Sequence, residues 1–355
     1  MTTIYLIRHA EAEGNLYRIA QGQDDSALTG RGWRQVRALE RRFTGVQIDE
    51  VYTSDLYRTR ATASALYRPR NLTPHLVPAL REIHVGLWER QTWGEISRRW
   101  PEQMRDFSQH MDRWHMEGAE TPAQVLRRVL EAIRTIAAEN EGKTVAVFSH
   151  GYAIRLVLAS LQGISLADTG PNTPTGDNTA VSCLTWDGET LHVVSQNDNS
   201  HLLTPEYLAG EKVRRRSTAL EPGLYFVPPR LPEQAEALDA LLSAAWDGAG
   251  DLPALEDGET GAALVGCLEE EPVGLIRFGA DPGEITLLCV RPDCRKRGFG
   301  VQLIGQAVYH WRPLGARHLR ARVPAGCAAE SFLRDCGFAP GEEGRWEKDI
   351  GFAEI

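Results

Sequence analysis

Long apolar runs are missing from this chain of 355 residues. No stretch approaches the roughly 20 apolar residues that a helix needs to cross a bilayer. The N-terminus passes directly into a strand-like segment, without the basic region and apolar run of a signal peptide. We therefore expect a cytoplasmic protein without membrane segments.

The cysteines lack the spacing of a zinc site or a redox pair. No two of the six stand in a Cys-x-x-Cys arrangement, and five fall in the last third of the chain. This pattern is typical of free thiols in a reducing compartment, and we expect no metal site. The cysteines are Cys183, Cys267, Cys289, Cys294, Cys327 and Cys336.

An excess of positive charge is also missing. The formal net charge is −9, which argues against bulk nucleic-acid binding. The charge is uneven, because residues 1–203 carry −2 and residues 204–355 carry −7. An anionic substrate of the first part would therefore need cations that are placed locally. The length and the 42% hydrophobic content fit two globular domains.

Two apolar segments, far apart in the sequence, each end in a histidine. Residues 3–7 are followed by Arg8 and His9, and residues 144–149 are followed by His150. Both segments are typical of buried strands. Ligands of open α/β sheets lie outside the carboxyl ends of the strands, so two parallel neighbours would bring both histidines to one site.

Strands and helices alternate through residues 1–203, which predicts an α/β fold with helices on both faces of the sheet, in three layers. Two further charged residues lie near predicted strand ends. Arg58 falls in the first turn of a helix that Ser54 or Asp55 can cap, and Glu82 follows a short strand. A helix start also favours an anion, which makes Arg58 a candidate phosphate ligand.

Together these residue types have the chemistry of phosphoryl transfer. Arginine forks bind phosphate oxygens and stay charged at any working pH. A neutral imidazole can attack phosphorus, and a protonated carboxyl group can donate to the leaving oxygen. Each residue alone has an ordinary structural explanation, and only the joint pattern predicts this function. The set is Arg8, His9, Arg58, Glu82 and His150.

Residues 1–203 resemble the histidine phosphatase superfamily, which has the phosphoglycerate-mutase-like fold. The resemblance is carried, in the family's order, by Arg8-His9 with Asn15, by residues 54–63, by Leu80-Arg81-Glu82 and by Ser149-His150-Gly151. It implies that His9 is the phosphorylated nucleophile and Glu82 the proton donor. It also implies a phosphate pocket with supporting amide contacts, formed by Arg8, Arg58 and His150 with Asn15 and Gln21.

The sequence departs from the family pattern at three positions, with Ala10 for a glycine, Ala12 for a serine or threonine and Arg90 for a glycine. None of these changes removes a reacting group. The short segment at residues 83–120 is similar to the phosphatase branch, so we expect hydrolysis of a small-molecule phosphoester without a metal ion. A phosphoglycerate mutase is the alternative.

Residues 204–222 are typical of a linker, and a domain of the α+β class is expected at residues 223–355. The linker carries a basic run (Lys212, Arg214–Arg216) that either faces solvent or docks on the acidic second domain. In that domain an apolar strand at residues 284–290 precedes a basic glycine loop and a helix. Such a loop can cradle an anion, because the first N–H groups of the helix point outward.

This loop resembles the acetyl-CoA loop of GNAT-type N-acetyltransferases. The resemblance is carried by Arg295-x-x-Gly298-x-Gly300 and by the later Cys336-Gly337-Phe338, and it covers about residues 223–350. It implies acetyl-CoA as the cofactor and an unknown amine as the acceptor. The implied contacts come from the loop and from a splayed strand, at Leu288, Val290, Arg295, Lys296, Arg297, Gly298, Phe299 and Gly300.

One departure puts the second activity in question. Leu333 stands where the family usually has the tyrosine that protonates the CoA thiolate. Acceptor-binding loops normally occupy the region of residues 247–261, which here is short and acidic, and Glu284 is a weak candidate base. Two hypotheses remain open: a bifunctional enzyme, and a phosphatase regulated by an inactive CoA-binding module. A homodimer is also left open.

Overall fold

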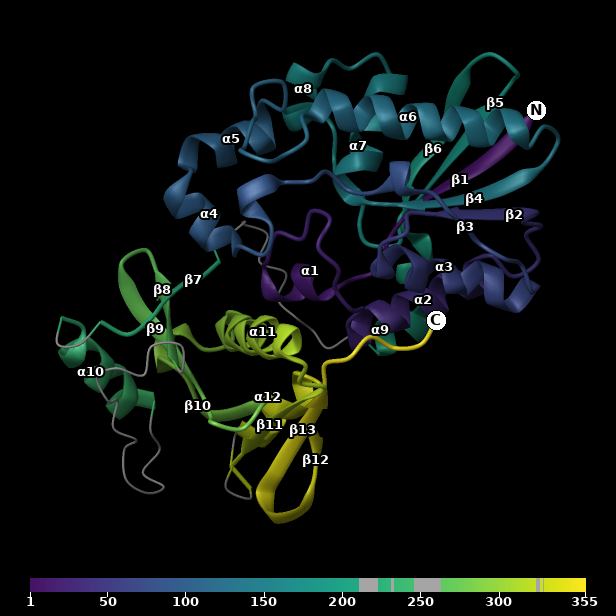
Figure 1. Ribbon diagram of the computed structural model, residues 1–355. Helices are drawn as coiled ribbons and strands as arrows, with labels where there is room; N and C mark the ends of the chain where they lie inside the picture. The colour runs from purple at the N-terminus through teal and green to yellow at the C-terminus, as the bar shows by residue number, and fades with distance from the viewer. Residues whose placement is uncertain (211–222, 231–232, 246–262, 324–325, 328) are drawn as a thin grey trace.

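The computed structural model describes residues 1–210, 223–230, 233–245, 263–323, 326–327 and 329–355. The basic run and the acidic segment at residues 247–261 lie outside these residues. The described chain forms two separate sheets with helices packed around them (Figure 1). The first sheet comes from the N-terminal half (residues 1–203) and the second from the C-terminal half (residues 223–355).

β1 (Thr2–Arg8) lies inside the first sheet, next to β4 (Thr144–Ser149). The two strands are parallel, and their register runs from Thr3 opposite Thr144 to Arg8 opposite Ser149. The two histidine-bearing strands are therefore parallel neighbours, which meets the condition under which the sequence pattern brings both histidines to one site. His9 and His150 follow them at the same edge of the sheet.

The other strands extend this sheet on both sides, in the order β3-β2-β4-β1-β5-β6. β2 (Glu50–Thr53) is parallel to β4, and β3 (His75–Leu76) is parallel to β2. β5 (Val181–Trp186) and β6 (Leu191–Asp198) form a hairpin, and β5 pairs antiparallel with β1.

Helices cover both faces of the first sheet, which gives the predicted α/β/α arrangement (Figure 1). α2 (Gly30–Arg42) and α3 (Tyr57–Arg70) pack on one face, while α6 (Pro122–Glu139) and α7 (Gly151–Leu161) pack on the other. Shorter helices complete this half: α1 (Glu13–Tyr17), α4 (Trp93–Arg99), α5 (Pro101–Gln109) and α8 (Leu166–Asn172), with α9 (Pro205–Ala209) after it.

The cap of α3 differs from the prediction. Neither Ser54 nor Asp55 caps it: the helix begins after Leu56, and the N–H of Tyr57 donates to Asp25 Oδ1 at 2.7 Å. Asp55 instead forms a two-point ion pair with Arg81. A carboxylate from a distant loop thus replaces the local cap, since the local residues have other partners.

The second sheet has the order β12-β13-β11-β10-β9-β8-β7. Its strands are β7 (Tyr225–Val227), β8 (Ala263–Leu268), β9 (Glu271–Phe278), β10 (Glu284–Val290), β11 (His318–Arg322), β12 (Ala339–Pro340) and β13 (Arg345–Asp349). α10 (Ala235–Ala245), α11 (Phe299–Trp311) and α12 (Ala329–Asp335) pack around it. None of the described helices is long and apolar enough to span a bilayer.

The two halves share a hydrophobic core. Tyr17 and Ile19 of the N-terminal half are buried in one cluster with Leu303 and Ala307 of α11. Figure 1 shows α11 directly beside α1, between the two sheets. The C-terminal Ile355 returns to pack against the core beneath α2 and α3. The halves are thus packed on each other as well as joined by the chain.

Candidate active site

His9 follows β1 and is buried, with 4% of its surface exposed. Its Nδ1 lies 2.8 Å from the carbonyl oxygen of Ala10, so Nδ1 carries the proton and Nε2 keeps its lone pair. Burial and the nearby guanidinium groups of Arg58 and Arg8 hold the pKa of His9 well below its usual range. His9 is therefore neutral at pH 7, which is the state that a nucleophilic imidazole needs.

His150 follows β4 and is completely buried. The centroid of its ring lies 5.3 Å from that of His9, and its Nε2 lies 2.9 Å from Ser54 Oγ. Burial, followed by the charge of Arg58, lowers the pKa of His150 well below its usual range. The two histidines therefore meet at one site, as the strand pattern predicted.

Two arginines lie beside these histidines. Arg58 in the first turn of α3 donates to the carbonyl oxygens of Asp24 at 2.9 Å and Gly22 at 2.7 Å. Arg8 at the end of β1 donates to the carbonyl oxygen of Gly176. Burial lowers the pKa of both guanidinium groups, but arginine starts so high that both stay charged.

Four buried side-chain nitrogen atoms of the predicted site residues have no hydrogen-bond partner in the described part of the chain, and three of them are N–H donors whatever the tautomer of His150. Buried donors in folded proteins nearly always have a partner. The four groups belong to residues that the sequence placed in the site, and two of them are cationic. An anion that accepts several hydrogen bonds would satisfy the donors together. They are Arg8 Nε, Gln21 Nε2, Arg58 Nε and His150 Nδ1.

Glu82 places its carboxylate at the start of α7, directly after His150. It accepts the N–H groups of Tyr152 at 3.1 Å and Ala153 at 3.0 Å, as well as its neighbour Ile83 at 3.1 Å. Its charge also raises the pKa of Arg8 and of Arg58 against the effect of burial. The five charged and imidazole side chains predicted from the sequence are thus brought together.

The amide candidates lie on the loop after His9. Asn15 is exposed, and its Oδ1 accepts the N–H of Ala12 at 3.0 Å, so it secures the start of α1. Gln21 is buried against Gly14, where a Cβ atom would overlap its side chain. Glycine at position 14 therefore lets the Gln21 amide lie close to α1. Asn15 Oδ1 also lies 3.5 Å from Asn178 Nδ2, which donates to the carbonyl oxygen of His9. A role of Gln21 in the pocket stays a prediction.

In the C-terminal half, the glycine loop leads into α11 as the sequence indicated. Lys296 and Gly298 have φ angles of 62° and 88°, and Gly298 is the residue before the helix. Arg295, Lys296 and Arg297 are exposed, while Phe299 is buried. Successive N–H groups in such a left-handed turn form a concave site for an anion.

β10 separates from its parallel neighbour beside this loop. It pairs with β11 only at Glu284 and Ile285, and then continues to Val290 paired with β9 alone. Leu288 and Val290 lie on the unpaired stretch, with half-buried side chains. This opening is the splayed strand that the resemblance implied, and the register shift after Ile285 marks where it begins.

Leu333 is buried in the core under α12 and lies among apolar side chains such as Trp346. A leucine at this position supplies no proton. Among the described residues, no cluster of three or more histidine, cysteine or acidic side chains has the arrangement of a metal site.

Comparison with known families decides the identity of the first half. The model of the histidine phosphatase superfamily (branch 1) matches residues 4–199, which is more than half of the chain. The chain belongs to this superfamily. The model of the acetyltransferase (GNAT) family matches residues 229–338. Both resemblances drawn from the motifs are therefore confirmed.

Named relatives of the histidine phosphatase part include both mutases and phosphatases. The chain is 32% identical over 167 residues to the probable phosphoglycerate mutase GpmB of Serratia proteamaculans, covering 46% of this chain and 76% of that protein. It is 29% identical over 167 residues to phosphoserine phosphatase 1 of Hydrogenobacter thermophilus, covering 47% and 79%.

A solved structure also matches the N-terminal half of the chain. YhfR of Bacillus stearothermophilus is 33% identical, with a TM-score of 0.55, and the match covers 57% of this chain and 100% of that one. The family is thus established for the N-terminal half. The named relatives do not share one reaction, because they include a probable mutase and a phosphatase.

Two of the departures from the histidine phosphatase pattern, Ala10 and Arg90, make contacts with other segments. Ala10 donates its N–H to Thr62 Oγ1 at 2.8 Å, which ties the loop after His9 to α3. Arg90 has a φ angle of 66°, a conformation that glycine adopts without strain. Its guanidinium lies over the ring of Tyr309 in the C-terminal half, 5.7 Å from the ring centroid.

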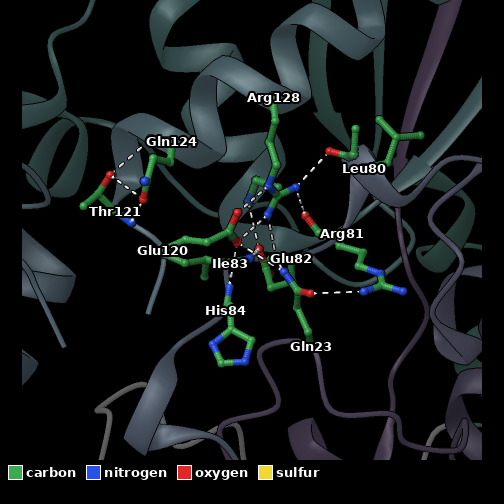
Figure 2. Close-up of polar contacts among 12 residues, drawn as sticks. Gln23, Leu80, Arg81, Glu82, Ile83, His84, Glu120, Thr121, Gln124 and Arg128 are labelled. Atoms are coloured by element: carbon green, nitrogen blue, oxygen red, sulfur yellow. Dashed lines mark hydrogen bonds and ion pairs between the residues drawn. The ribbon is translucent and has the colours of Figure 1, made fainter. Parts of the chain in front are cut away.

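Sequence reasoning missed the network that holds the backbone of Glu82 (Figure 2). Arg128 of α6 donates to the carbonyl oxygens of Ala79 at 2.8 Å, Arg81 at 2.7 Å and Glu82 at 2.8 Å. Its Nε donates to Glu120 at 2.7 Å, and Glu120 accepts the N–H of His84 at 3.0 Å. The available signal was the position of Arg128, three residues after the buried Val125 on the inward side of α6.

A groove of about 830 Å³ lies beside this network, and Arg128, Glu120 and His84 line it. The groove is lined by Gln23, His84, Gly118, Ala119, Glu120, Gln124, Arg127, Arg128 and Glu131.

Sequence reasoning also missed Asn178, which donates to the carbonyl oxygen of His9 at 3.0 Å. A polar residue in a loop gives no signal of such a contact in the sequence.

Proposed function

We propose that the N-terminal half hydrolyses a small phosphate monoester through a phosphohistidine at His9. The observation that carries the proposal is the neutral imidazole of His9 beside Arg8 and Arg58, two buried guanidinium groups whose Nε atoms have no partner among the described residues. Donors fixed in advance around a phosphoryl group stabilise the charge that develops on its oxygens. Arg8, Arg58 and His150 would bind these oxygens.

The reaction has two steps. His9 Nε2 attacks phosphorus, so a nitrogen–phosphorus bond forms while the bond from phosphorus to the leaving oxygen breaks. The protonated carboxyl group of Glu82 gives its proton to that oxygen. Water then attacks the phosphorus atom, the nitrogen–phosphorus bond breaks, and inorganic phosphate leaves. The proton lost by water returns to the Glu82 carboxylate.

The products formed from a test substrate distinguish hydrolysis from mutase chemistry. The named relatives suggest phosphoserine and 3-phosphoglycerate as the first compounds to test. Release of inorganic phosphate from either one would support the phosphatase. Conversion of 3-phosphoglycerate to 2-phosphoglycerate with little phosphate release would instead assign the mutase reaction.

The nucleophile is tested with His9→Ala, assayed against a panel of phosphate monoesters. The variant should lose phosphatase activity by at least a thousandfold and should form no acid-labile phosphoenzyme, because no other described side chain takes the place of Nε2. His115→Ala, at an exposed histidine of the same half, serves as the control. Substantial activity in His9→Ala would overturn the mechanism.

For the C-terminal half we propose that residues 295–300 bind the pyrophosphate of acetyl-CoA, with the pantetheine arm in the opening between β10 and β11. The turn at Lys296 and Gly298 and the separation after Ile285 support this site. Transfer of the acetyl group to an amine is the expected reaction. The buried Leu333 favours a second candidate, a module that binds acetyl-CoA without turnover.

Calorimetric titration with acetyl-CoA, followed by an amine panel monitored for free thiol, separates these candidates. We expect binding in the micromolar range, and its loss in Gly298→Val, because a side chain with φ near 88° is strained there. Thiol release with an amine would assign the transferase. Binding without thiol release would assign the regulatory module, and absence of binding would refute both.

A further inference from the structure

One side of α11 faces the histidine phosphatase half. Gly305, Tyr309 and Arg312 follow one another at intervals of four and three residues, which places them in one row at the side and end of the helix. A Cβ atom at Gly305 would overlap Tyr17 of α1, so the two helices approach closely there. The carbonyl oxygen of Tyr309 accepts a long hydrogen bond from Arg90, at 3.5 Å.

Arg312 ends this row with a two-point ion pair across the boundary between the halves. Its Nη1 and Nη2 lie 2.8 Å and 2.7 Å from the two carboxylate oxygens of Glu13. The side chains are only 18% and 7% exposed, respectively. In its own half, Arg312 Nε donates to the carbonyl oxygen of Ile350 at 2.6 Å. A pair with this geometry holds two segments in a fixed relation.

Glu13 is the first residue of α1, in the segment that follows the nucleophile. Its carboxylate also accepts the N–H of Ala27 at 3.1 Å, and its own N–H donates to the carbonyl oxygen of Ala27 at 2.9 Å. Glu13 therefore closes the segment from α1 to Ala27. This segment contains Gln21, and its Gly22 and Asp24 carbonyl oxygens hold the Arg58 guanidinium.

The C-terminal tail contacts Tyr57, the residue before Arg58. The Tyr57 hydroxyl donates to the carbonyl oxygen of Ala353 at 2.9 Å, and the ring of Tyr57 meets Phe352 with centroids 4.8 Å apart. The Arg312 guanidinium lies over Phe352, 5.1 Å from its ring centroid. Arg312 thus links the two contacts.

We infer that Arg312, a residue of the acetyltransferase-like half, is a positioning residue of the phosphatase site. Through Glu13 it holds the loop of residues 13–27, and this loop presents Gln21 and orients Arg58 toward the phosphoryl oxygens. The C-terminal half then contributes to substrate binding at the phosphatase site of the N-terminal half. This inference rests on the proposed phosphatase function, because its measurements are phosphoester kinetics.

The test compares full-length Arg312→Leu, Arg312→Lys and Arg98→Leu in phosphate monoester kinetics. Arg98 is the matched control, because it also crosses the boundary, over the Tyr225 ring at 4.6 Å, while its guanidinium pairs with Glu95 of its own helix and not with Glu13. We expect Arg312→Leu to raise KM about tenfold or more, with a smaller fall in kcat. Arg312→Lys should recover part of the loss, since it keeps the charge. Arg98→Leu should stay within twofold.

Each protein is assayed well below its own Tm, so that a loss of stability does not appear as a loss of binding. A KM in Arg312→Leu within twofold of the original value, or an equal rise in Arg98→Leu, would overturn the inference. Should Arg312→Leu fail to fold, Arg312→Lys decides alone, because loss of the two-point geometry should still raise KM severalfold. An inactive original protein would instead refute the proposed function.

Discussion

At the scale of single residues, the site depends on what surrounds its reacting groups. His9 is neutral because it is buried between two arginines, and its tautomer is set by one carbonyl oxygen. The order of the motifs in the sequence was enough to predict which residues form the site. Their hydrogen-bond partners could not be predicted, because Arg58 is held by the carbonyl oxygens of Gly22 and Asp24, and every residue type has such a backbone oxygen.

The Arg128 network leads to a prediction about proton donation. Arg128 holds three carbonyl oxygens around Glu82, so Arg128→Gln should displace the acid without removing it (Figure 2). We expect kcat/KM to fall about tenfold for alkyl phosphates, whose leaving oxygens need a proton. Aryl phosphates with good leaving groups should lose about twofold, since they need little protonation. A plot of log kcat/KM against leaving-group pKa measures the difference.

Arg127→Gln provides the matched control for this experiment, because Arg127 is the exposed neighbour on the same helix. Its plot should coincide with that of the original protein. Glu82→Gln should steepen the plot more than Arg128→Gln does. Parallel loss for both classes of substrate in Arg128→Gln would mean that Arg128 supports folding and has no part in placing the acid.

At the scale of elements, periodic patterns predicted most of the fold. The start of α6 is an example, because Thr121 and Gln124, spaced as a capping box requires ahead of an apolar periodic run, form that box, and Val125, Val129 and Ile133 are buried. The cap of α3 could not be predicted, since its carboxylate comes from Asp25 on another segment. The separation of β10 from β11 followed only from a family resemblance, because strand alternation does not report where pairing ends.

At the scale of the whole molecule, the relation between the halves was beyond sequence reasoning. Tyr17 and Ile19 belong to the first half in the sequence, yet they are buried with α11. Glu13 and Arg312 are separated by nearly the whole chain and pair across the boundary. Each half has its own regular pattern of apolar and polar residues. The contacts between the halves do not change that pattern, so local periodicity does not indicate them.

The buried histidines predict how the stability of the whole molecule depends on pH. Burial is the main cause that holds the pKa values of His9 and His150 well below the usual range and lowers that of His201 to about 4. The unfolded chain protonates these groups near pH 6.5, whereas the folded chain does not. The free energy of unfolding should therefore fall as the pH drops below about 6.5. Each histidine contributes up to about 1.4 kcal/mol per pH unit until its folded pKa is reached.

His201 allows a direct measurement of one such contribution. Its Nε2 lies 2.9 Å from Thr179 Oγ1 and it has no proposed role in the reaction. Urea unfolding at pH 7.5 and at pH 5.0 should show a smaller loss of stability in His201→Gln than in the original protein, by about 1 to 2 kcal/mol. His115→Gln, at an exposed position, should keep the original slope. Identical pH dependence in all three proteins would show that His201 titrates alike in the folded and unfolded chains, because a difference in proton binding must appear in this slope.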